Sequence, residues 1–258
     1  MKIALYQMHI EWENKEKNYL RAEQKLKTAY DRNVDLLLLP EMSFTGFSMN
    51  TAATKERDHE TINKMSDYAI QYNTAIGFGW VKDCGEKSEN HYTIVNKEGK
   101  VISDYAKIHP FSFSGEDRKF CGGEDLAVFE LGGMIFSTFI CYDLRFPEIF
   151  QAVSGKADVI CVPANWPKKR REHWKCLLQA RAIENQVYIL AINCFGNIGE
   201  IDYSGDSCII NPNGEILAEL SEQENVLEYE LQNDVEKFRN AFQIKADRRE
   251  ELYRRFMK

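Results

Sequence analysis

The sequence predicts an α/β fold in which helices pack on the faces of mixed β-sheets. Short apolar segments of strand length alternate with segments whose apolar residues recur at helical spacing. The 258 residues are 44% hydrophobic, which is enough to bury a sizeable core. No stretch rich in Pro, Gly or Ser and no long block of like charge divides the chain. We therefore expect a single domain over residues 1–258.

The first half of the chain contains several well-defined elements. Residues 3–7 have the character of a strand, and residues 15–33 that of an amphipathic helix. The apolar face of this helix is expected to comprise Tyr19, Ala22, Leu26 and Ala29. Residues 36–39 are consecutive leucines, a pattern typical of a strand that is covered on both faces. The other elements expected here are a helix over 58–72 and strands over 74–81, 92–96 and 101–105, with a hairpin at 97–100.

The second half continues the alternation. A strand over 134–140 runs into Cys141, and Pro147 marks the start of the next helix. Further elements expected are strands over 159–162, 188–193, 207–211 and 216–220, a helix over 172–185 and a turn at 211–214. Residues 108–125 form a long segment without obvious secondary structure, and such loops are often functional.

Composition excludes several classes of protein. The net charge of −7 argues against a nucleic-acid-binding protein, whose surface would be basic. The basic run at 168–171 is expected to be a solvated loop and, secondarily, a patch that steers anions. No apolar run approaches the roughly 20 residues that a membrane helix needs, and residues 1–13 lack the features of a signal peptide. We therefore expect a cytoplasmic protein that does not enter a membrane.

The seven cysteines do not suggest a metal site or a disulfide framework. They are scattered, and none belongs to a Cys-x-x-Cys pair. Most are expected to be small buried hydrophobic residues.

Cys141 is the first candidate for chemistry. It closes a predicted strand and opens a turn, where a nucleophile is exposed, rigidly held and close to backbone N–H groups that can bind an oxyanion. A buried core cysteine is the alternative. A cysteine nucleophile also needs a base or an electropositive neighbour to become a thiolate. None of the five histidines lies in a motif typical of a protease base, although catalytic partners can meet in space whatever their separation in sequence.

A carboxylate and an ammonium lie at comparable places. Glu41 follows the leucine run, and Lys107 follows the strand predicted at 101–105. Taken singly, each would be expected to be a solvated surface residue. The combination with Cys141 changes that expectation, because the carboxyl ends of parallel strands are where α/β sheets place their sites.

These three residues resemble the Glu-Lys-Cys triad of the nitrilase superfamily. Glu41 lies in Leu-Pro-Glu-Met, Lys107 in Tyr-Ala-Lys-Ile-His and Cys141 in Ile-Cys-Tyr-Asp-Leu-Arg-Phe-Pro-Glu, in the family's order and spacing. Further segments similar to the family lie at 163–167, 173–186, 205–207 and 211–214. The resemblance runs nearly the full length of the chain. It implies a four-layer αββα sandwich of the nitrilase type with mixed sheets, which usually forms a homodimer or a higher homo-oligomer.

The resemblance also assigns catalytic roles. Glu41 would be the general base, and Cys141 would form a thioester with the substrate. Lys107 and a backbone N–H near Tyr142 would stabilise the charge on the substrate oxygen. Neither a metal nor an organic cofactor is implied. Many relatives carry a second glutamate between the lysine and the cysteine, which Glu116 matches better than its competitor Asp117.

Within the superfamily, the segments around Cys141, Trp166 and residues 180–186 most resemble the omega-amidase branch. This implies a small amide substrate such as 2-oxoglutaramate or 2-oxosuccinamate. Such substrates carry a carboxylate far from the amide. Arg145 is a candidate to bind this carboxylate, since a guanidinium can bind it in a bidentate fork. A structural ion pair of Arg145 with Glu148 or Asp143 is the alternative.

Other residues near the predicted site are given the following roles. Asn165 and Trp166 follow the strand at 159–162, so both are expected to bind substrate, with Trp166 as a pocket wall or, alternatively, a core residue. Trp174 is expected to lie in the core. Arg181 and Glu184 are three residues apart on one helix and are expected to form a structural pair.

Other functions remain open at this point. A relative acting on deaminated glutathione or on an N-carbamoyl compound would share the triad and differ in its pocket. A non-catalytic relative that serves as a binding or scaffolding module would normally have lost part of the triad, whereas Glu41, Lys107 and Cys141 are all present. An unrelated α/β domain with a structural Cys141 would require every matching segment to be accidental.

Overall fold

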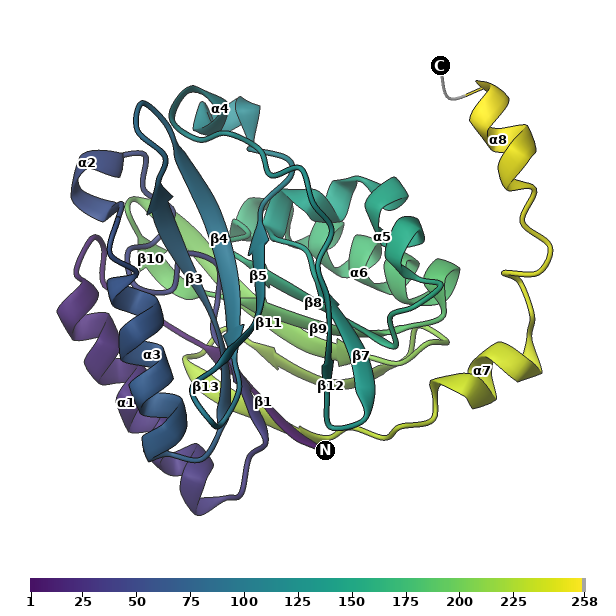
Figure 1. Ribbon diagram of the computed structural model, residues 1–258, viewed down its shortest axis with the longest axis horizontal. Coiled ribbons are helices and arrows are strands. Elements are labelled where there is room, and N and C mark those ends of the chain that lie inside the picture. Colours follow the sequence, from purple (N-terminus) through teal and green to yellow (C-terminus); the bar gives the residue numbers. More distant parts are fainter. Residues whose placement is uncertain (257–258) are drawn as a thin grey trace.

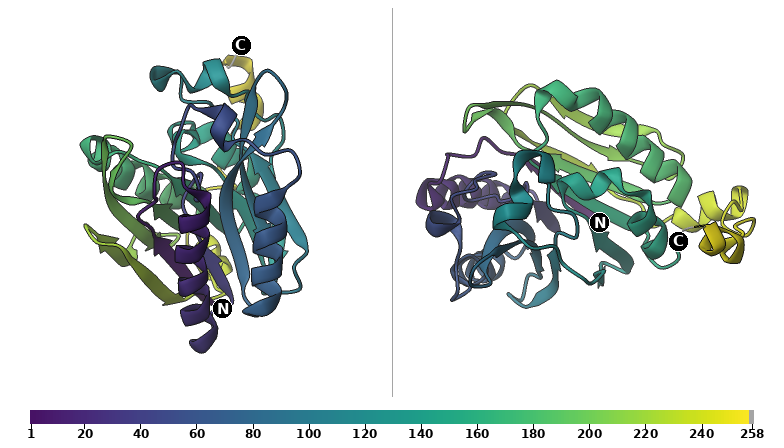
Figure 2. Two further views of the ribbon diagram at one scale, coloured as in Figure 1. Left: turned by 90° about the vertical axis from the view of Figure 1, so that its left-hand side faces the viewer. Right: turned by 90° about the horizontal axis from the view of Figure 1, so that it is seen from above.

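Two β-sheets stacked face to face form the centre of the molecule, and helices cover their outer faces (Figures 1 and 2). The computed structural model describes residues 1–256. Its layers follow the order helix, sheet, sheet, helix, which confirms the predicted αββα sandwich. Both sheets contain parallel and antiparallel pairs, as expected for mixed sheets.

The first sheet places the ends of two strands and the start of a third at one of its edges. Its strands are β1 (Lys2–Gln7), β2 (Leu36–Leu38), β3 (Ala75–Asp83), β4 (Ser88–Val95), β5 (Val101–Ala106) and β13 (Asn225–Glu230), in the order β13-β1-β2-β3-β4-β5. β1, β2 and β3 are parallel, whereas β4 and β5 each run antiparallel to the strand before. As a result, β2 and β5 end, and β4 begins, at the same end of the sheet.

The second sheet brings the carboxyl ends of three strands together. Its strands are β6 (Val128–Leu131), β7 (Met134–Thr138), β8 (Val159–Ala164), β9 (Tyr188–Asn193), β10 (Phe195–Ile198), β11 (Ile201–Ile210) and β12 (Ile216–Ser221). The order is β10-β11-β9-β8-β7-β6, and β12 also pairs with β11. Since β7, β8 and β9 are parallel, their carboxyl ends lie together.

Helices cover the two sheets on opposite sides (Figure 1). The first sheet is covered by α1 (Lys15–Asp31) and α3 (Glu60–Gln71), and the second by α5 (Pro147–Val153) and α6 (Arg171–Asn185). Shorter elements are α2 (Thr51–Thr54), α4 (Glu116–Lys119), α7 (Val235–Ala241), α8 (Glu250–Phe256) and the 3₁₀ helices η1 (Ser112–Ser114), η2 (Cys141–Arg145) and η3 (Lys168–Arg170).

The four-leucine run shows how the layers share the core. Leu36 and Leu38 pack in the cluster that fills the space between the sheets, together with residues of β7, β8 and β9. Leu37 and Leu39 point the other way, into the cluster beneath α1 and α3. All four are 0% exposed, which confirms the prediction of a strand covered on both faces.

The structure corrects several predicted boundaries. Residues 108–125 are not a structureless loop, because η1 and α4 lie within them. β4 begins at Ser88 and β11 at Ile201, earlier than expected, because polar residues on these strands interrupt the apolar pattern. Elements absent from the prediction are α2, β6, β10, β13, α7 and α8. They are short or carry mainly exposed and half-buried residues, so their apolar periodicity is weak.

The cysteines are distributed differently from the prediction. Cys161, Cys194 and Cys208 are buried, whereas Cys84 and Cys176 are exposed and the remaining two are half-buried. The expectation that most would be buried is therefore wrong. Cys84 follows the last residue of β3 and Cys176 lies on an outward position of α6, so neither faces the core.

The C-terminal part of the chain leaves the sandwich and runs past the end of α5 (Figures 1 and 2). Arg239 of α7 pairs with Asp158 at 3.2 Å, and Arg248 donates a hydrogen bond to Gln151 of α5 at 3.0 Å. No helix within residues 1–256 combines the length and the apolar character needed to cross a membrane.

Candidate active site

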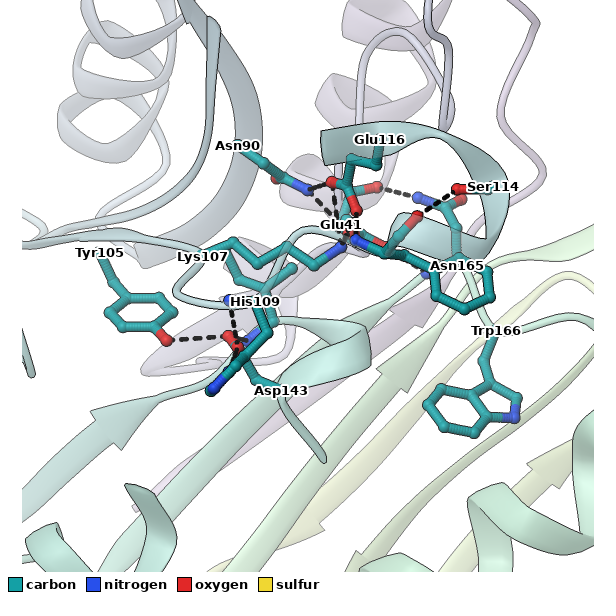
Figure 3. A network of polar contacts seen from close by, with 12 residues as sticks. Glu41, Asn90, Tyr105, Lys107, His109, Ser114, Glu116, Asp143, Asn165 and Trp166 are labelled. Carbon is teal, nitrogen blue, oxygen red and sulfur yellow. Dashed lines mark hydrogen bonds and ion pairs between the residues drawn. The ribbon is translucent and has the colours of Figure 1, made fainter. Parts of the chain in front are cut away.

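Glu41 and Lys107 lie side by side near the ends of the two sheets (Figure 3), and Cys141 lines the same pocket as Lys107. Glu41 lies three residues past β2, Lys107 directly follows β5, and Cys141 lies three residues past β7. The ammonium Nζ of Lys107 lies 2.9 Å from Oε1 of Glu41. Glu41 is 0% exposed and Lys107 is 1% exposed, so this ion pair is shielded from water.

Glu116 completes the charged cluster. It is the first residue of α4, and Nζ of Lys107 lies 2.9 Å from its Oε2 and 3.1 Å from its Oε1. Its neighbour Asp117 is exposed on the same helix. The choice of Glu116 over Asp117 as the acid beside Lys107 therefore agrees with the geometry.

Burial and charge set the protonation states of the cluster. Burial alone lowers the pKa of Lys107, but the carboxylates of Glu116 and Glu41 outweigh this effect and raise it above its ordinary value. Burial also raises the pKa of Glu116. The pKa of the Cys141 thiol is raised well above its ordinary value, first by burial and then by the negative charge of Glu41. Both effects favour the neutral thiol of Cys141 over a preformed thiolate.

The backbone of Cys141 has an unusual conformation. Its φ is +48°, in the left-handed region that a non-glycine residue seldom adopts, and it opens η2. Such conformations persist only where the surroundings hold them in place. The sharp turn directs the residue into the pocket at the end of β7, as expected for a nucleophile at a strand-to-helix turn.

The buried carboxylate of Asp143 stabilises this turn through hydrogen bonds. It is 0% exposed and accepts hydrogen bonds from the backbone N–H of Ile140 and of His109, both at 3.0 Å. The hydroxyl of Tyr105 donates a further hydrogen bond to it at 2.8 Å, and Nδ1 of His109 lies 2.7 Å away (Figure 3). These bonds tie η2 to the segment that carries Lys107.

A pocket of about 160 Å³ leads to Cys141. Six of its fifteen lining residues are aromatic, namely Phe47, Phe111, Phe113, Tyr142, Trp166 and Tyr203. Lys107 and Asn165 also line it, and Arg145, Lys169 and Arg170 add three further cations. The pocket is thus narrow and apolar, with cationic groups along its lining.

Comparison with known proteins identifies the family. Residues 2–240 match the carbon–nitrogen hydrolase family. The chain belongs to this family. A hydrolase in the agr operon of Staphylococcus aureus is 33% identical, over 98% of this chain and the whole of that relative. A 2-oxoglutaramate amidase from Bacillus subtilis strain 168 is 34% identical, over 97% of this chain and 98% of the relative.

A solved structure supports the same assignment. It is a mutant of the amidase from Nesterenkonia sp. AN1, in which acrylamide has added to the active-site cysteine. The identity is 25% and the TM-score is 0.89, with all of both chains covered. The protein described here is therefore an amidohydrolase of the carbon–nitrogen hydrolase family, and a cysteine nucleophile fits that family.

Other predicted site residues of this hydrolase also lie at the pocket. The backbone N–H of Asn165 donates to Oε2 of Glu41 at 2.9 Å, and its side-chain Nδ2 donates to the backbone O of Glu41 at 2.7 Å. Asn165 therefore positions Glu41 as well as lining the pocket. Trp166 is only 3% exposed but lines the pocket as well, so the two roles considered for it are both present.

Arg145 is not held in the ion pair considered as the alternative to substrate binding. Within residues 1–256 it forms no ion pair with Glu148 or Asp143. Its guanidinium carbon lies 4.8 Å from the centroid of the Trp166 ring, and its Nη2 lies 3.3 Å from Nδ1 of His173. An arginine stacked on an aromatic wall of the pocket remains available to an anion.

The basic run at 168–171 is solvated at Lys168 and Lys169, as predicted, but it is helical instead of a loop. It forms η3 and the first residue of α6, and Lys169 and Arg170 line the pocket. Arg171 pairs with Asp206 at 2.7 Å instead. The structural predictions for the following helix are confirmed, since Trp174 is 0% exposed and Arg181 pairs with Glu184 at 3.0 Å.

Several residues at or beside the pocket are absent from the sequence prediction. Phe111 and Phe113 lie in the 108–125 segment, whose length alone marked it as functional. Asn90 lies on β4, and no motif in the sequence marks it. Within the described part of the chain, the His, Cys, Asp and Glu side chains form no group of three or more suited to a metal ion.

Proposed function

We propose that this hydrolase cleaves the terminal amide of a short omega-amide that carries a carboxylate at its other end. 2-Oxoglutaramate and 2-oxosuccinamate are the substrates that fit best. The observation that carries the proposal is Arg145, which lines the pocket against Trp166 with no carboxylate partner within residues 1–256. The Bacillus subtilis relative named as a 2-oxoglutaramate amidase supports the same substrate class.

The pocket dimensions agree with a short substrate. Its volume of about 160 Å³ is small beside the roughly 300–1,000 Å³ of pockets that bind drug-sized ligands. The aromatic wall would cover the short aliphatic chain, and the guanidinium would bind the distal carboxylate. The amide carbon would then lie at Cys141.

Acylation begins with the thiol of Cys141. Glu41 takes the thiol proton as sulfur attacks the amide carbon, and the C–N bond then breaks as the same proton passes to the departing nitrogen. Within the described residues, Oε2 of Glu41 accepts one hydrogen bond, from Asn165, so it keeps a lone pair for this proton. Ammonia leaves, and the acyl group remains on sulfur as a thioester.

The tetrahedral intermediate carries a negative charge on the former amide oxygen. The ammonium of Lys107 and the backbone N–H of Tyr142 would stabilise this charge. Glu116 helps to keep Lys107 protonated, since its carboxylate raises the pKa of the lysine. The positive charge of Lys107 is therefore in place before negative charge develops on the substrate oxygen.

Deacylation repeats the steps with water. Glu41 takes a proton from water as it attacks the thioester carbon, the C–S bond breaks, and the proton returns to the sulfur of Cys141. The products are the carboxylic acid and ammonia. No step in this scheme requires a metal or an organic cofactor.

A panel of substrates tests the assignment. Ammonia release would be measured with 2-oxoglutaramate, 2-oxosuccinamate, glutamine and deaminated glutathione, and with an N-carbamoyl amino acid. We expect kcat/KM to be highest for the two oxo-acid amides. A higher kcat/KM for deaminated glutathione or for the N-carbamoyl compound would reject the substrate assignment and leave the catalytic triad intact.

Arg145→Ala tests the anchoring role. Kinetics would be compared for 2-oxoglutaramate and for pentanamide, an uncharged amide of the same chain length. We expect the loss in kcat/KM to be about 10- to 100-fold larger for the anionic substrate, because a charged hydrogen-bond pair is lost. Arg32→Ala is the matched control, since Arg32 lies at the end of α1 with a side chain that is 58% exposed. Equal losses on both substrates would reject the role.

The proposal also includes a homodimer, as the family resemblance implies. Light scattering coupled to size-exclusion chromatography would measure the mass of the assembly. A monomer of 30.0 kDa at micromolar concentration would reject the dimer.

A further inference from the structure

Asn90 points its side-chain amide at the two buried carboxylates of the site (Figure 3). It is the third residue of β4 and is 2% exposed. Its Nδ2 donates hydrogen bonds to Oε1 of Glu41 at 2.8 Å and to Oε1 of Glu116 at 3.2 Å. Its backbone oxygen accepts a hydrogen bond from the backbone N–H of Lys107 at 2.8 Å. One asparagine thus contacts all three charged residues.

The orientation of the Asn90 amide is imposed by the site. Its Oδ1 is buried and has no hydrogen-bond partner within residues 1–256. Leaving a buried carbonyl unpaired is unfavourable, and such groups are rare in folded proteins. The opposite orientation would direct this oxygen at two carboxylates. The cost at Oδ1 is therefore offset by the two hydrogen bonds that Nδ2 donates.

Two carboxylates that share one ammonium repel each other, which favours protonation of one of them. Like charges at short range disfavour the ionised form of both, whereas hydrogen bonds donated to a carboxylate favour it. A carboxamide supplies two such donors without adding a charge. The carboxamide therefore leaves Lys107 as the cation that faces the substrate oxygen. A second cation at position 90 would change the charge of the cluster.

We propose that Asn90 is a positioning residue that holds Glu41 and Glu116 correctly spaced around Lys107 by donating a hydrogen bond to each carboxylate. This inference rests on the proposed catalytic roles of Glu41 and Lys107. The ionisable groups at the cluster come from different elements, namely Glu41 after β2, Lys107 after β5, Glu116 on α4 and Cys141 on η2. Their protonation is coupled, so the relevant measurement is the apparent pKa of activity.

Two variants separate the donor from the shape of the side chain. Asn90→Leu keeps a similar size and removes both donors. Asn90→Asp keeps the shape, removes the donors and adds a third acid. We expect kcat on the best amide substrate to fall about 10- to 100-fold in Asn90→Leu, because two hydrogen bonds to charged groups are lost, and further in Asn90→Asp. KM should change little, since Asn90 does not line the substrate pocket.

The pH profile is the decisive measurement. Removing hydrogen-bond donors from a carboxylate disfavours its ionised form, so the coupled acid cluster as a whole would reach its active form only at a higher pH. The acid limb of the kcat/KM profile should therefore move to higher pH in both variants, and more so in Asn90→Asp. A purely structural role would lower kcat or the melting temperature without moving this limb.

Controls separate this inference from the proposed mechanism. Asn63→Leu changes an exposed asparagine on α3 and should leave kcat and the pH profile unchanged. Glu41→Gln and Cys141→Ala should abolish turnover, and activity in either would reject the mechanism itself. Suppose that Glu41→Gln and Cys141→Ala are inactive, while folded Asn90→Leu and Asn90→Asp keep the acid limb of the wild type. The positioning role of Asn90 would then be rejected and the proposed mechanism would stand. Near-ultraviolet circular dichroism would establish that each variant is folded.

Discussion

The ammonium of Lys107 lies 2.9 Å from Oε1 of Glu41, and the two side chains are almost completely shielded from water. Burying charged groups is costly unless they are paired and hydrogen-bonded. Here Glu116 on α4 pairs with Lys107, and Asn90 on β4 donates hydrogen bonds to the carboxylates. Both residues lie on elements other than those that carry Glu41 and Lys107. The cluster is therefore sensitive to changes in residues that never touch the substrate.

Glu116→Gln should lower kcat about 10- to 100-fold, because it removes one of the two carboxylates that hold Lys107 protonated and in place. Asp117→Asn is the matched control. It makes the same chemical change one residue later, at an exposed position. Steady-state ammonia release would measure both. A loss of similar size in Asp117→Asn, or none in Glu116→Gln, would contradict the geometry.

The thiol of Cys141 should remain protonated near neutral pH. Burial and the charge of Glu41 raise its pKa, so the thiolate forms only at alkaline pH. The ultraviolet absorbance of the thiolate would be titrated as the difference between wild type and Cys141→Ala, which isolates this cysteine from the other six. Glu41→Gln removes a negative charge, so it should lower the thiol pKa while abolishing turnover. A thiolate already present in the wild type at about pH 7 would show that Glu41 is not needed to take the proton.

Gly79→Ala should displace Glu41. A methyl group on Gly79 of β3 would overlap the backbone nitrogen of Met42 and would lie 2.9 Å from the carbonyl carbon of Glu41. Because small displacements of a catalytic group can cost roughly 100-fold in rate, we expect a large fall in kcat. Gly155→Ala is the control, since a methyl group there meets no atom within 4 Å. Wild-type kcat in folded Gly79→Ala would show that this close approach does not position Glu41.

Catalysis of an anionic substrate should depend on salt. Arg145, Lys169 and Arg170 line the pocket and form no ion pair within residues 1–256. Raising the ionic strength from about 0.02 M to about 0.5 M should lower kcat/KM for 2-oxoglutaramate by roughly threefold or more, by screening the attraction. Pentanamide should show no such dependence. Arg170→Gln should reduce the salt dependence for 2-oxoglutaramate, and an unchanged dependence would exclude Arg170 from steering.

Much of the fold follows from local patterns in the sequence. The four leucines of 36–39, the apolar face of α1 and the hairpin between β4 and β5 were all predicted from residue spacing, and the structure confirms them. Predictions fail where elements are short or half exposed. β13 has six residues without a clear apolar alternation, and α4 has only four residues. Neither segment therefore has a periodic pattern long enough to detect.

The sequence by itself determined that a carboxylate, an ammonium and a thiol each follow the end of a strand. This was possible because a strand and the residue that ends it are local features of the chain. Only the tertiary structure decided that Asn90 bridges Glu41 and Glu116, and that Arg145 stacks on Trp166 instead of pairing with Glu148. Such contacts join residues far apart in sequence, and they depend on how the two sheets and their connecting segments pack together. Local propensity carries no information about that packing.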